Sequence, residues 1–229
     1  MAITLAFDVY GTLIDTAGVT EALKQYVGDR AAAFSGLWRD KQLEYSFRRG
    51  LMQNYQSFAV CTRNALDYAC AHFHADIPQA AREKLMAGYK TLPVFPDAAE
   101  GLEDLRSAGF RMFAFSNGLA QDVSGLLRNA GIDRYFAGVV SVDEVRSFKP
   151  NPAVYCHFLR RAQSTGGAAW LISGNPFDVI GAISAGMRGA WIQRSAEAVF
   201  DPWEIAPTIT VSNIRDLRGA ITNFMGQGQ

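Results

Sequence analysis

The sequence predicts an α/β protein in which a parallel sheet carries a helical domain inserted after its first strand. From residue 93 onward, strand-like and helix-like segments alternate, which indicates βαβ units and therefore parallel strands. The stretch before it, residues 17–92, has helical periodicity and almost no strand signal. We therefore assign residues 1–16 and 93–229 to a Rossmann-like core domain, and residues 17–92 to a helical cap domain.

The first predicted strand covers residues 3–7 and ends at Asp8, before a turn at Gly11. In the helical stretch, Leu43, Phe47 and Leu51 recur at intervals of four residues, as on one face of a helix. The segment 93–96, with a proline at each end, breaks this pattern.

Beyond this break, Asp97 is a predicted N-cap, and Gly109 and Gly131 are predicted to end helices. Asn151 or Pro152 begins a later helix, and the C-terminal segment 226–229 is predicted to be a loose tail. The predicted helices cover about 97–107, 118–130, 151–163 and 177–185, and the predicted strands cover about 110–115, 139–141, 168–172 and 190–192.

The composition excludes several classes of function. Lysine plus arginine equals aspartate plus glutamate, at 22 each, and no long basic block exists, so we expect no nucleic-acid partner. No apolar run reaches the ~18 residues of a membrane span, and the chain begins with a strand rather than a leader, so we expect a cytoplasmic protein. The three cysteines include no CxxC pair, which argues against a zinc site or a disulfide framework, although Cys61 could pair with Cys70.

Four polar clusters follow directly after predicted strands. They are Asp8-Val9-Tyr10-Gly11-Thr12, Ser116-Asn117-Gly118, Lys149-Pro150 and Ser173-Gly174-Asn175-Pro176-Phe177-Asp178. Because parallel strands end at the same edge of a sheet, we expect two carboxylates, one ammonium, and several hydroxyls and carboxamides to meet there.

In order and spacing, these four clusters resemble the motifs of the haloacid dehalogenase superfamily over nearly the whole chain. Trp38-Arg39, Gln42-Leu43-Glu44-Tyr45 and Tyr155 are similar to positions of its L-2-haloacid dehalogenase branch. The resemblance implies hydrolytic dehalogenation of short L-2-haloacids, and of haloacetates including fluoroacetate, to D-2-hydroxyacids. Asp8 would form an aspartyl ester, without a metal or other cofactor.

The resemblance also implies a role for each candidate residue. Arg39 and Asn117 would receive the halide ion, and Ser116 with the backbone near Tyr10 would hold the substrate carboxylate. Lys149 would keep Asp8 ionised, Thr12 would hydrogen-bond Asp8, and Tyr155 would support Lys149 or the substrate pocket. The remaining catalytic candidates, expected to orient Lys149 and the hydrolytic water, are Ser173, Asn175 and Asp178. Further substrate-binding candidates are Leu43, Phe58 and Phe177, and the family suggests a homodimer.

Two other functions stay open at this point. A Mg²⁺-dependent phosphatase of the same superfamily usually carries aspartates at the places of Tyr10 and Gly174, so both residues favour dehalogenation. A catalytically idle binding protein is disfavoured because all expected catalytic residue types are present. Asp40, Gly174 and Phe177 depart from the branch and put the substrate range, rather than the mechanism, in question.

Each candidate also has a simpler structural interpretation. Asp8 could form only an Asx turn, and Arg39 could be a solvated helix residue. Ser116 and Asn117 could cap the next helix, Asp178 could favour a helix dipole, and Tyr155 or Phe58 could be core residues.

Overall fold

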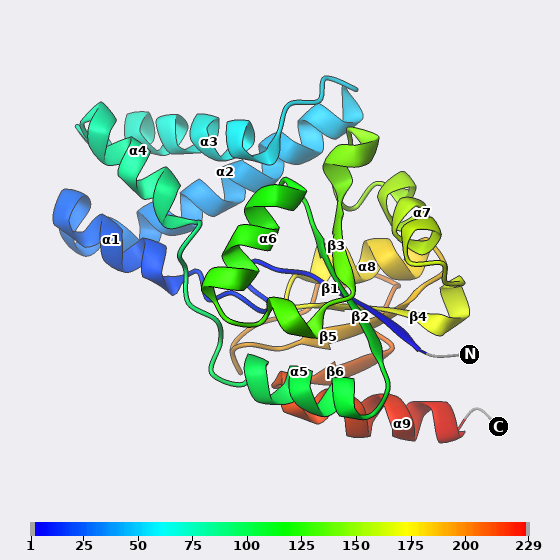
Figure 1. The fold of residues 1–229 in the computed structure, drawn as a ribbon. Helices are drawn as coiled ribbons and strands as arrows, with labels where there is room; N and C mark the ends of the chain where they lie inside the picture. The colour runs from blue at the N-terminus through cyan, green and yellow to red at the C-terminus, as the bar shows by residue number, and fades with distance from the viewer. Residues whose placement is uncertain (1–2, 228–229) are drawn as a thin grey trace.

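A computed structural model describes residues 3–227 and contains one six-stranded sheet in the order β3-β2-β1-β4-β5-β6 (Figure 1). All five pairs of neighbouring strands are parallel. The strands are β1 (Thr4–Phe7), β2 (Arg111–Ser116), β3 (Gly138–Ser141), β4 (Ala169–Ser173), β5 (Arg188–Ile192) and β6 (Ile209–Val211). The expected α/β fold with a Rossmann-like sheet is confirmed.

Helices cover both faces of the sheet, as the alternation of side chains along β1 requires. Leu5 and Phe7 point into a core shared with α5 (Ala98–Ser107), α6 (Ala120–Asn129) and α9 (Leu217–Gln227). Ala6 points to the opposite face, where α7 (Pro152–Arg161) and α8 (Pro176–Ser184) pack. Fully buried strands of a parallel sheet are apolar on both faces, which explains the continuous apolar run of β1.

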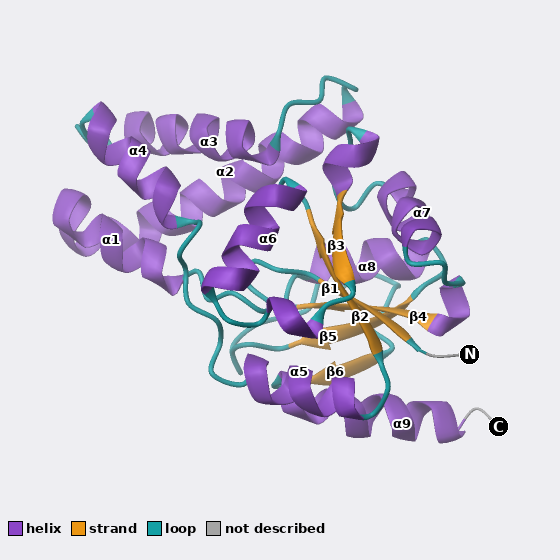
Figure 2. Ribbon diagram, viewed as in Figure 1, coloured by secondary structure: helices purple, strands orange, loops and turns teal. Residues whose placement is uncertain are grey.

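The chain between β1 and α5 forms four helices, which we call the helical insertion: α1 (Ala17–Val27), α2 (Ala31–Leu51), α3 (Phe58–His72) and α4 (Gln79–Gly88). They gather on one side of the sheet, away from α5 and α9 (Figure 2). Trp38 of α2 is buried and donates from its indole nitrogen to the carbonyl of Thr62 in α3, at 2.9 Å. Whether residues 17–92 form a separate domain stays a prediction.

Two neighbouring segments join the helical insertion to the rest of the chain. The backbone nitrogen of Asp15 donates to the carbonyl of Pro93 at 2.8 Å, and that of Phe95 donates to the carbonyl of Leu13 at 2.9 Å. The outgoing and returning segments therefore pair with each other as a short antiparallel bridge.

Several expected boundaries need correction. Asp97 precedes α5, but its side chain makes no capping bond and instead binds Arg194 and the backbone nitrogen of Ile214. Gly226 and Gln227 end α9 rather than forming a tail, while residues 228–229 lie outside the described part. β6 and α9 were not predicted, because their short or weakly patterned segments resemble loops. Asn151 does cap α7, accepting from the backbone nitrogen of Ala153 at 2.9 Å.

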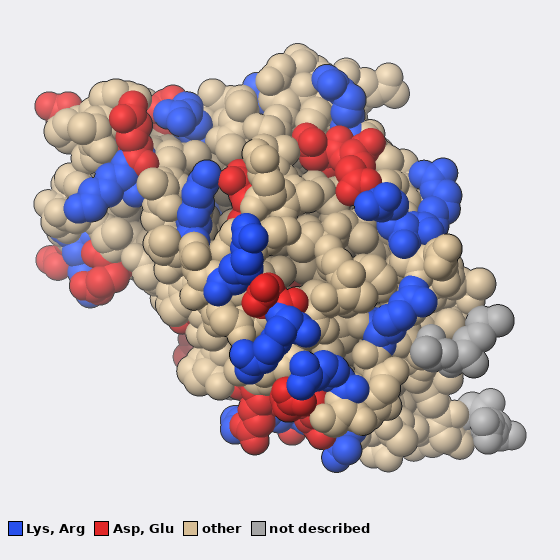
Figure 3. Space-filling model, in the orientation of Figure 1, with Lys and Arg blue, Asp and Glu red and all other residues tan. Residues whose placement is uncertain are grey.

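Charge and thiol chemistry on the chain are unremarkable. Basic and acidic side chains alternate in small groups over the face shown in Figure 3. Cys61, Cys70 and Cys156 are free, so the alternative of a Cys61–Cys70 disulfide is wrong.

Within residues 3–227, no helix combines the length and the apolar character that crossing a membrane requires.

Gly101 provides a test of how α5 packs on the sheet core. A methyl group at this position would lie 2.6 Å from Cγ2 of Ile214 and 2.8 Å from its carbonyl carbon. We expect Gly101→Ala to lower the free energy of unfolding by about 1–3 kcal/mol, measured by urea denaturation. Gly125→Ala in α6 is the control, because nothing lies within 4 Å of the added methyl group there, and it should stabilise by up to about 1 kcal/mol. Equal stability of the wild type and Gly101→Ala would contradict this packing.

Candidate active site

The order of the strands brings the predicted polar clusters together. Asp8 follows the central strand β1, and its backbone nitrogen donates to the carbonyl of Ile172 in β4 at 2.9 Å. In the register of the sheet, Phe7 lies beside Ala114 of β2 and Ile172 of β4. The residues that end β2 and β4 therefore flank Asp8 on its two sides.

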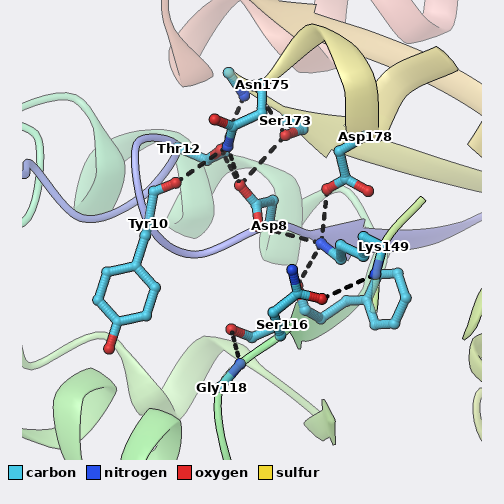
Figure 4. Close-up of polar contacts among 12 residues, drawn as sticks. Asp8, Tyr10, Thr12, Ser116, Gly118, Lys149, Ser173, Asn175 and Asp178 are labelled. Atoms are coloured by element: carbon cyan, nitrogen blue, oxygen red, sulfur yellow. Dashed lines mark hydrogen bonds and ion pairs between the residues drawn. The ribbon is translucent and has the colours of Figure 1, made fainter. Parts of the chain in front are cut away.

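The two oxygens of the Asp8 carboxylate have different partners (Figure 4). Oδ2 accepts hydrogen bonds from Thr12 Oγ1 at 2.9 Å, Asn175 Nδ2 at 2.7 Å and Ser173 Oγ at 3.3 Å. Oδ1 accepts from Lys149 Nζ at 3.1 Å. Asp8 is 8% exposed, so the carboxylate is almost entirely held by protein groups.

Lys149 is a buried ammonium with three acceptors. Its Nζ donates to Asp8 Oδ1, to Asp178 Oδ2 at 2.6 Å and to the carbonyl of Phe115 at 2.9 Å. Burial opposes the charge on Lys149, but the adjacent carboxylates of Asp178 and Asp8 outweigh it and raise the pKa of Lys149. The ammonium is thus the shared counter-ion of two carboxylates.

Asp178 lies in the first turn of α8 and is fully buried. Burial raises its pKa to about 6, and the charge on Asp8 acts in the same direction, while Lys149 and the Tyr155 hydroxyl oppose the rise. Tyr155 of α7 donates to Asp178 Oδ1 at 2.8 Å. Tyr155 thus reaches Lys149 through Asp178, and its supporting role stays a prediction.

Ser173 and Asn175 have different contacts from those expected. Both side chains bond Asp8 directly, so among the three residues expected to orient Lys149 only Asp178 contacts its ammonium. Asn175 Nδ2 also donates to the carbonyl of Tyr10 at 3.2 Å, which fixes the turn after Asp8. An orienting role toward the hydrolytic water stays a prediction.

Ser116 and Asn117 are buried at the end of β2. Ser116 Oγ accepts from the backbone nitrogen of Gly118 at 3.1 Å, and Asn117 Oδ1 accepts from the backbone nitrogen of Lys149 at 3.0 Å. Neither side chain caps α6, whose N-cap is Leu119. Because Asn117 Oδ1 already accepts a hydrogen bond from Lys149, the amide NH₂ group of Asn117 is the part that could donate to a ligand.

The loop that contains Asp8 also contacts Arg194, which was not predicted, and Gly174 of the fourth polar cluster. Arg194, which follows β5, donates from Nε to the carbonyl of Thr12 at 3.2 Å and pairs with Asp97 at 2.8 Å. Gly174 lies so close to this loop that a Cβ at position 174 would be 2.4 Å from the carbonyl oxygen of Gly11. Any side chain at position 174 would therefore displace the loop.

A cavity of about 100 Å³ lies between the helical insertion and the sheet core. Of the predicted residues, Tyr10, Arg39 and Phe58 line it. The other residues that line it are Thr16, Val19, Ser35, Gln42, Ala59, Thr62, Met86, Tyr89, Lys90, Gly118, Leu119 and Asp122. Leu43 and Phe177 do not line it, and the Phe177 ring instead lies 5.3 Å from that of Phe47, so their substrate-binding roles stay predictions.

Arg39 connects this cavity to the Asp8 cluster. Its Nη1 donates to Gln42 Oε1 at 2.6 Å, and its Nη2 donates to Asn175 Oδ1 at 3.3 Å. Asn175 in turn donates to Asp8, so one carboxamide bridges the guanidinium and the carboxylate. Burial lowers the pKa of Arg39, while Tyr89, Asp8 and Asp40 oppose that change.

Several residues that line the cavity have no signal in the sequence. Tyr89, Lys90 and Asp122 come from a helix end, a loop and an exposed helix turn, where such residue types are ordinary. Gln42 stands within the motif around Arg39, and its contacts with Arg39 and Thr62 could have been proposed from that neighbourhood.

A metal would have few ligands in this cluster. Asp8 and Asp178 both bond Lys149, and within residues 3–227 no group of three or more His, Cys, Asp or Glu side chains is arranged to hold a metal ion.

Comparisons with known proteins place this arrangement in a family. Residues 4–186 match the model of the haloacid dehalogenase-like hydrolases. The chain is 36% identical to haloacetate dehalogenase H-2 of Moraxella sp. (strain B), over 90% of this chain and 92% of that one. It is 33% identical to (S)-2-haloacid dehalogenase 2 of Pseudomonas sp. (strain CBS-3), over 93% of each.

Solved structures agree with these relatives. The L-2-haloacid dehalogenase from Xanthobacter autotrophicus with chloropropionic acid covalently bound superimposes with a TM-score of 0.88 at 30% identity, covering 97% of this chain and 99% of that one. The chain therefore belongs to the haloacid dehalogenase-like hydrolases.

The bond from Tyr155 to Asp178 can be tested by titration. The hydroxyl group stabilises the ionised form of Asp178, whose pKa burial raises to about 6. Tyr155→Phe removes this donor, so we expect the pKa of Asp178 to rise further, by about one pH unit. Carboxyl ¹³C NMR, with the signal assigned through Asp178→Asn, measures it. Tyr135→Phe, whose hydroxyl binds Arg134 instead, should leave the titration unchanged, and an unchanged midpoint in Tyr155→Phe would refute the effect.

Proposed function

We propose that this protein hydrolyses the carbon–halogen bond of short L-2-haloacids and haloacetates through a covalent ester on Asp8, giving D-2-hydroxyacids from the chiral substrates. The observation that carries the proposal is the Asp8 carboxylate, with one oxygen held by three neutral donors and the other facing Lys149. The dehalogenase relatives, and the neighbour with chloropropionic acid covalently bound, support the same chemistry.

The unequal partners of the two carboxylate oxygens suggest which of them attacks. Oδ2 accepts from Thr12, Ser173 and Asn175. Among residues 3–227, Oδ1 accepts only from Lys149 and keeps a free lone pair. Oδ1 attacks carbon 2 of the substrate from the side opposite the halogen, the new carbon–oxygen bond forms, and the halide leaves with the electron pair. Carbon 2 is inverted, and no proton donor is needed.

Arg39 and Asn117 receive the leaving halide. The guanidinium is half-buried at the cavity wall, where its charge interacts more strongly than in water, and Phe58 supplies an apolar wall. Ser116 and the backbone near Tyr10 hold the substrate carboxylate, and the Tyr10 carbonyl is already fixed by Asn175. The substrate thus lies between the cavity and Asp8.

The second step releases the product. Water attacks the acyl carbon of the Asp8 ester, negative charge develops on Oδ2, and Thr12, Ser173 and Asn175 stabilise it there as an oxyanion hole. The bond from the acyl carbon to the ester oxygen breaks, the hydroxyacid leaves with the attacking oxygen of Asp8, and one proton is released. Water oxygen remains in the regenerated carboxylate.

The residues also favour this reaction over metal-dependent phosphate transfer. Lys149 bonds both carboxylates, and position 174 has no room for an aspartate side chain. Tyr10 points its ring away from Asp8 (Figure 4), so its hydroxyl is badly placed to protonate an alkoxide leaving group on that carboxylate.

The proposal includes a setting for the enzyme. We place it in the cytoplasm as a homodimer whose residues 17–92 act as one cap domain. The three free thiols support a reducing compartment, and the exposed side chains of Leu51 and Met52, at the end of α2, support a self-association surface.

Asp8→Asn tests the covalent mechanism directly. We expect halide release from L-2-chloropropionate, resistant to EDTA and absent with the D isomer, and at least ~10⁴-fold slower in Asp8→Asn. In a single turnover of the wild type in H₂¹⁸O, mass spectrometry should find ¹⁸O in the peptide that carries Asp8. Asp133→Asn, at an exposed site, is the control. Fluoroacetate is assayed in parallel, and Mg²⁺-dependent hydrolysis of p-nitrophenyl phosphate without any halide release would assign the chain to the phosphatases instead.

Arg39→Lys tests the halide site. A lysine keeps the charge but has one nitrogen in place of the planar guanidinium, whose two terminal nitrogens bond Gln42 and Asn175 separately, so we expect kcat/KM for L-2-chloropropionate to fall by about 10²-fold or more. Arg48→Lys is the control, since Arg48 lies on the same helix and pairs with Glu44 at the surface. Equal activity of Arg39→Lys and the wild type would remove Arg39 from the halide site.

A further inference from the structure

An ion pair that no part of the mechanism uses lies at the cavity. Lys90 Nζ is 3.0 Å from Asp122 Oδ1, and both residues line the cavity. Lys90 follows Tyr89, the residue that caps the end of α4 in the helical insertion, whereas Asp122 lies in the first turn of α6 in the sheet core. The side chains are 62% and 31% exposed, so the pair stands where the cavity meets solvent.

Neighbouring contacts fix this pair in place. The carbonyl of Lys90 accepts from Asn129 Nδ2, at the far end of α6, at 3.2 Å. The segment after α4 accordingly runs beside α6 (Figure 1). Tyr10 and Tyr89 line the same cavity with ring centroids 6.0 Å apart, and burial, Tyr89 and Asp122 together raise the pKa of Tyr10. Asp122 is therefore electrostatically coupled to the cavity interior as well as to Lys90.

The charges that line the cavity match one type of substrate. Its charged residues in the described chain are Arg39, Lys90 and Asp122. Asp122 balances Lys90, which leaves the single positive charge of Arg39. A 2-haloacid with one carboxylate, held by Ser116 and the backbone near Tyr10, needs no cation beyond Arg39, which receives the halide. A second carboxylate near Lys90 would face Asp122 and be repelled.

We propose that Asp122 makes this cavity selective for haloacids with one carboxylate by occupying Lys90 and repelling a second carboxylate. This selectivity rests on the proposed dehalogenase function. Without Asp122, Lys90 becomes available to pair with the second carboxylate of a 2-halodicarboxylic acid. Asp122 and Lys90 are thus specificity-determining residues outside the Asp8 cluster.

The experiment compares kcat/KM for L-2-chlorosuccinate with kcat/KM for L-2-chloropropionate. In Asp122→Asn we expect the ratio of dicarboxylate to monocarboxylate to rise about five- to tenfold at low ionic strength. The double variant Asp122→Asn/Lys90→Gln should lose that rise, because the freed ammonium is gone. Added salt should reduce the rise, since the pair is exposed. Asp67→Asn is the matched control. Asp67 forms an ion pair of 2.8 Å with Arg82, and neither residue lines the cavity.

A measurement that needs no chemistry separates this proposal from the function it rests on. Succinate and propionate, which carry no halogen, are titrated as ligands of Asp122→Asn and the wild type by calorimetry. We expect the succinate-to-propionate affinity ratio to rise in the variant by a similar factor. If the wild type releases chloride but both ratios are unchanged in Asp122→Asn, the selectivity proposal is overturned and the dehalogenase function stands. Absence of chloride release from every substrate would overturn the function itself.

Discussion

The shared ion pair of Lys149 with Asp8 and Asp178 is the interaction on which the rest of the site depends. A charge taken out of water is costly unless it is paired and hydrogen-bonded, and these three groups are almost completely buried. Each comes from a different part of the chain: the end of β1, the segment after β3 and the start of α8. Removing Lys149 would leave two buried carboxylates without their shared counter-ion, so the segment after β3 has to be in register with the end of β1 and the start of α8.

The sheet meets that requirement because β1 is central. With β2 on one side and β4 on the other, Asp8 has two flanking strands, which supply the Phe115 carbonyl and Ser173. Arg39, from the helical insertion, donates a hydrogen bond to Asn175, and Asn175 donates one to Asp8. The pairing of the strands thus fixes the position of Asp8, and hydrogen bonds through Asn175 fix Arg39 relative to it.

Local sequence patterns predicted much of this arrangement. Strand ends with polar residues placed Asp8, Ser116 and Ser173 correctly, because parallel strands share one carboxyl edge, whereas Lys149 is separated from the end of β3 by a 3₁₀ helix (Val142–Val145). The specific partners were less accessible: Ser173 and Asn175 bond Asp8 instead of Lys149, and Asp97 bonds Arg194 instead of capping α5. Lys90 is exposed and Asp122 is half-buried, and they lie 32 residues apart in the chain, so only the folded structure shows that they meet. The three-residue strand β6 was too short for its pattern to stand out.

The closeness of Gly174 to the Gly11 carbonyl restricts how this enzyme could evolve. A carboxylate at position 174 would be one route toward divalent-metal chemistry, yet its Cβ would lie 2.4 Å from that oxygen. The substitution would have to be preceded by a change in the loop that holds Thr12 and Asp8. A single mutation at position 174 would clash with the Gly11 carbonyl, so it is a poor path from one reaction to the other.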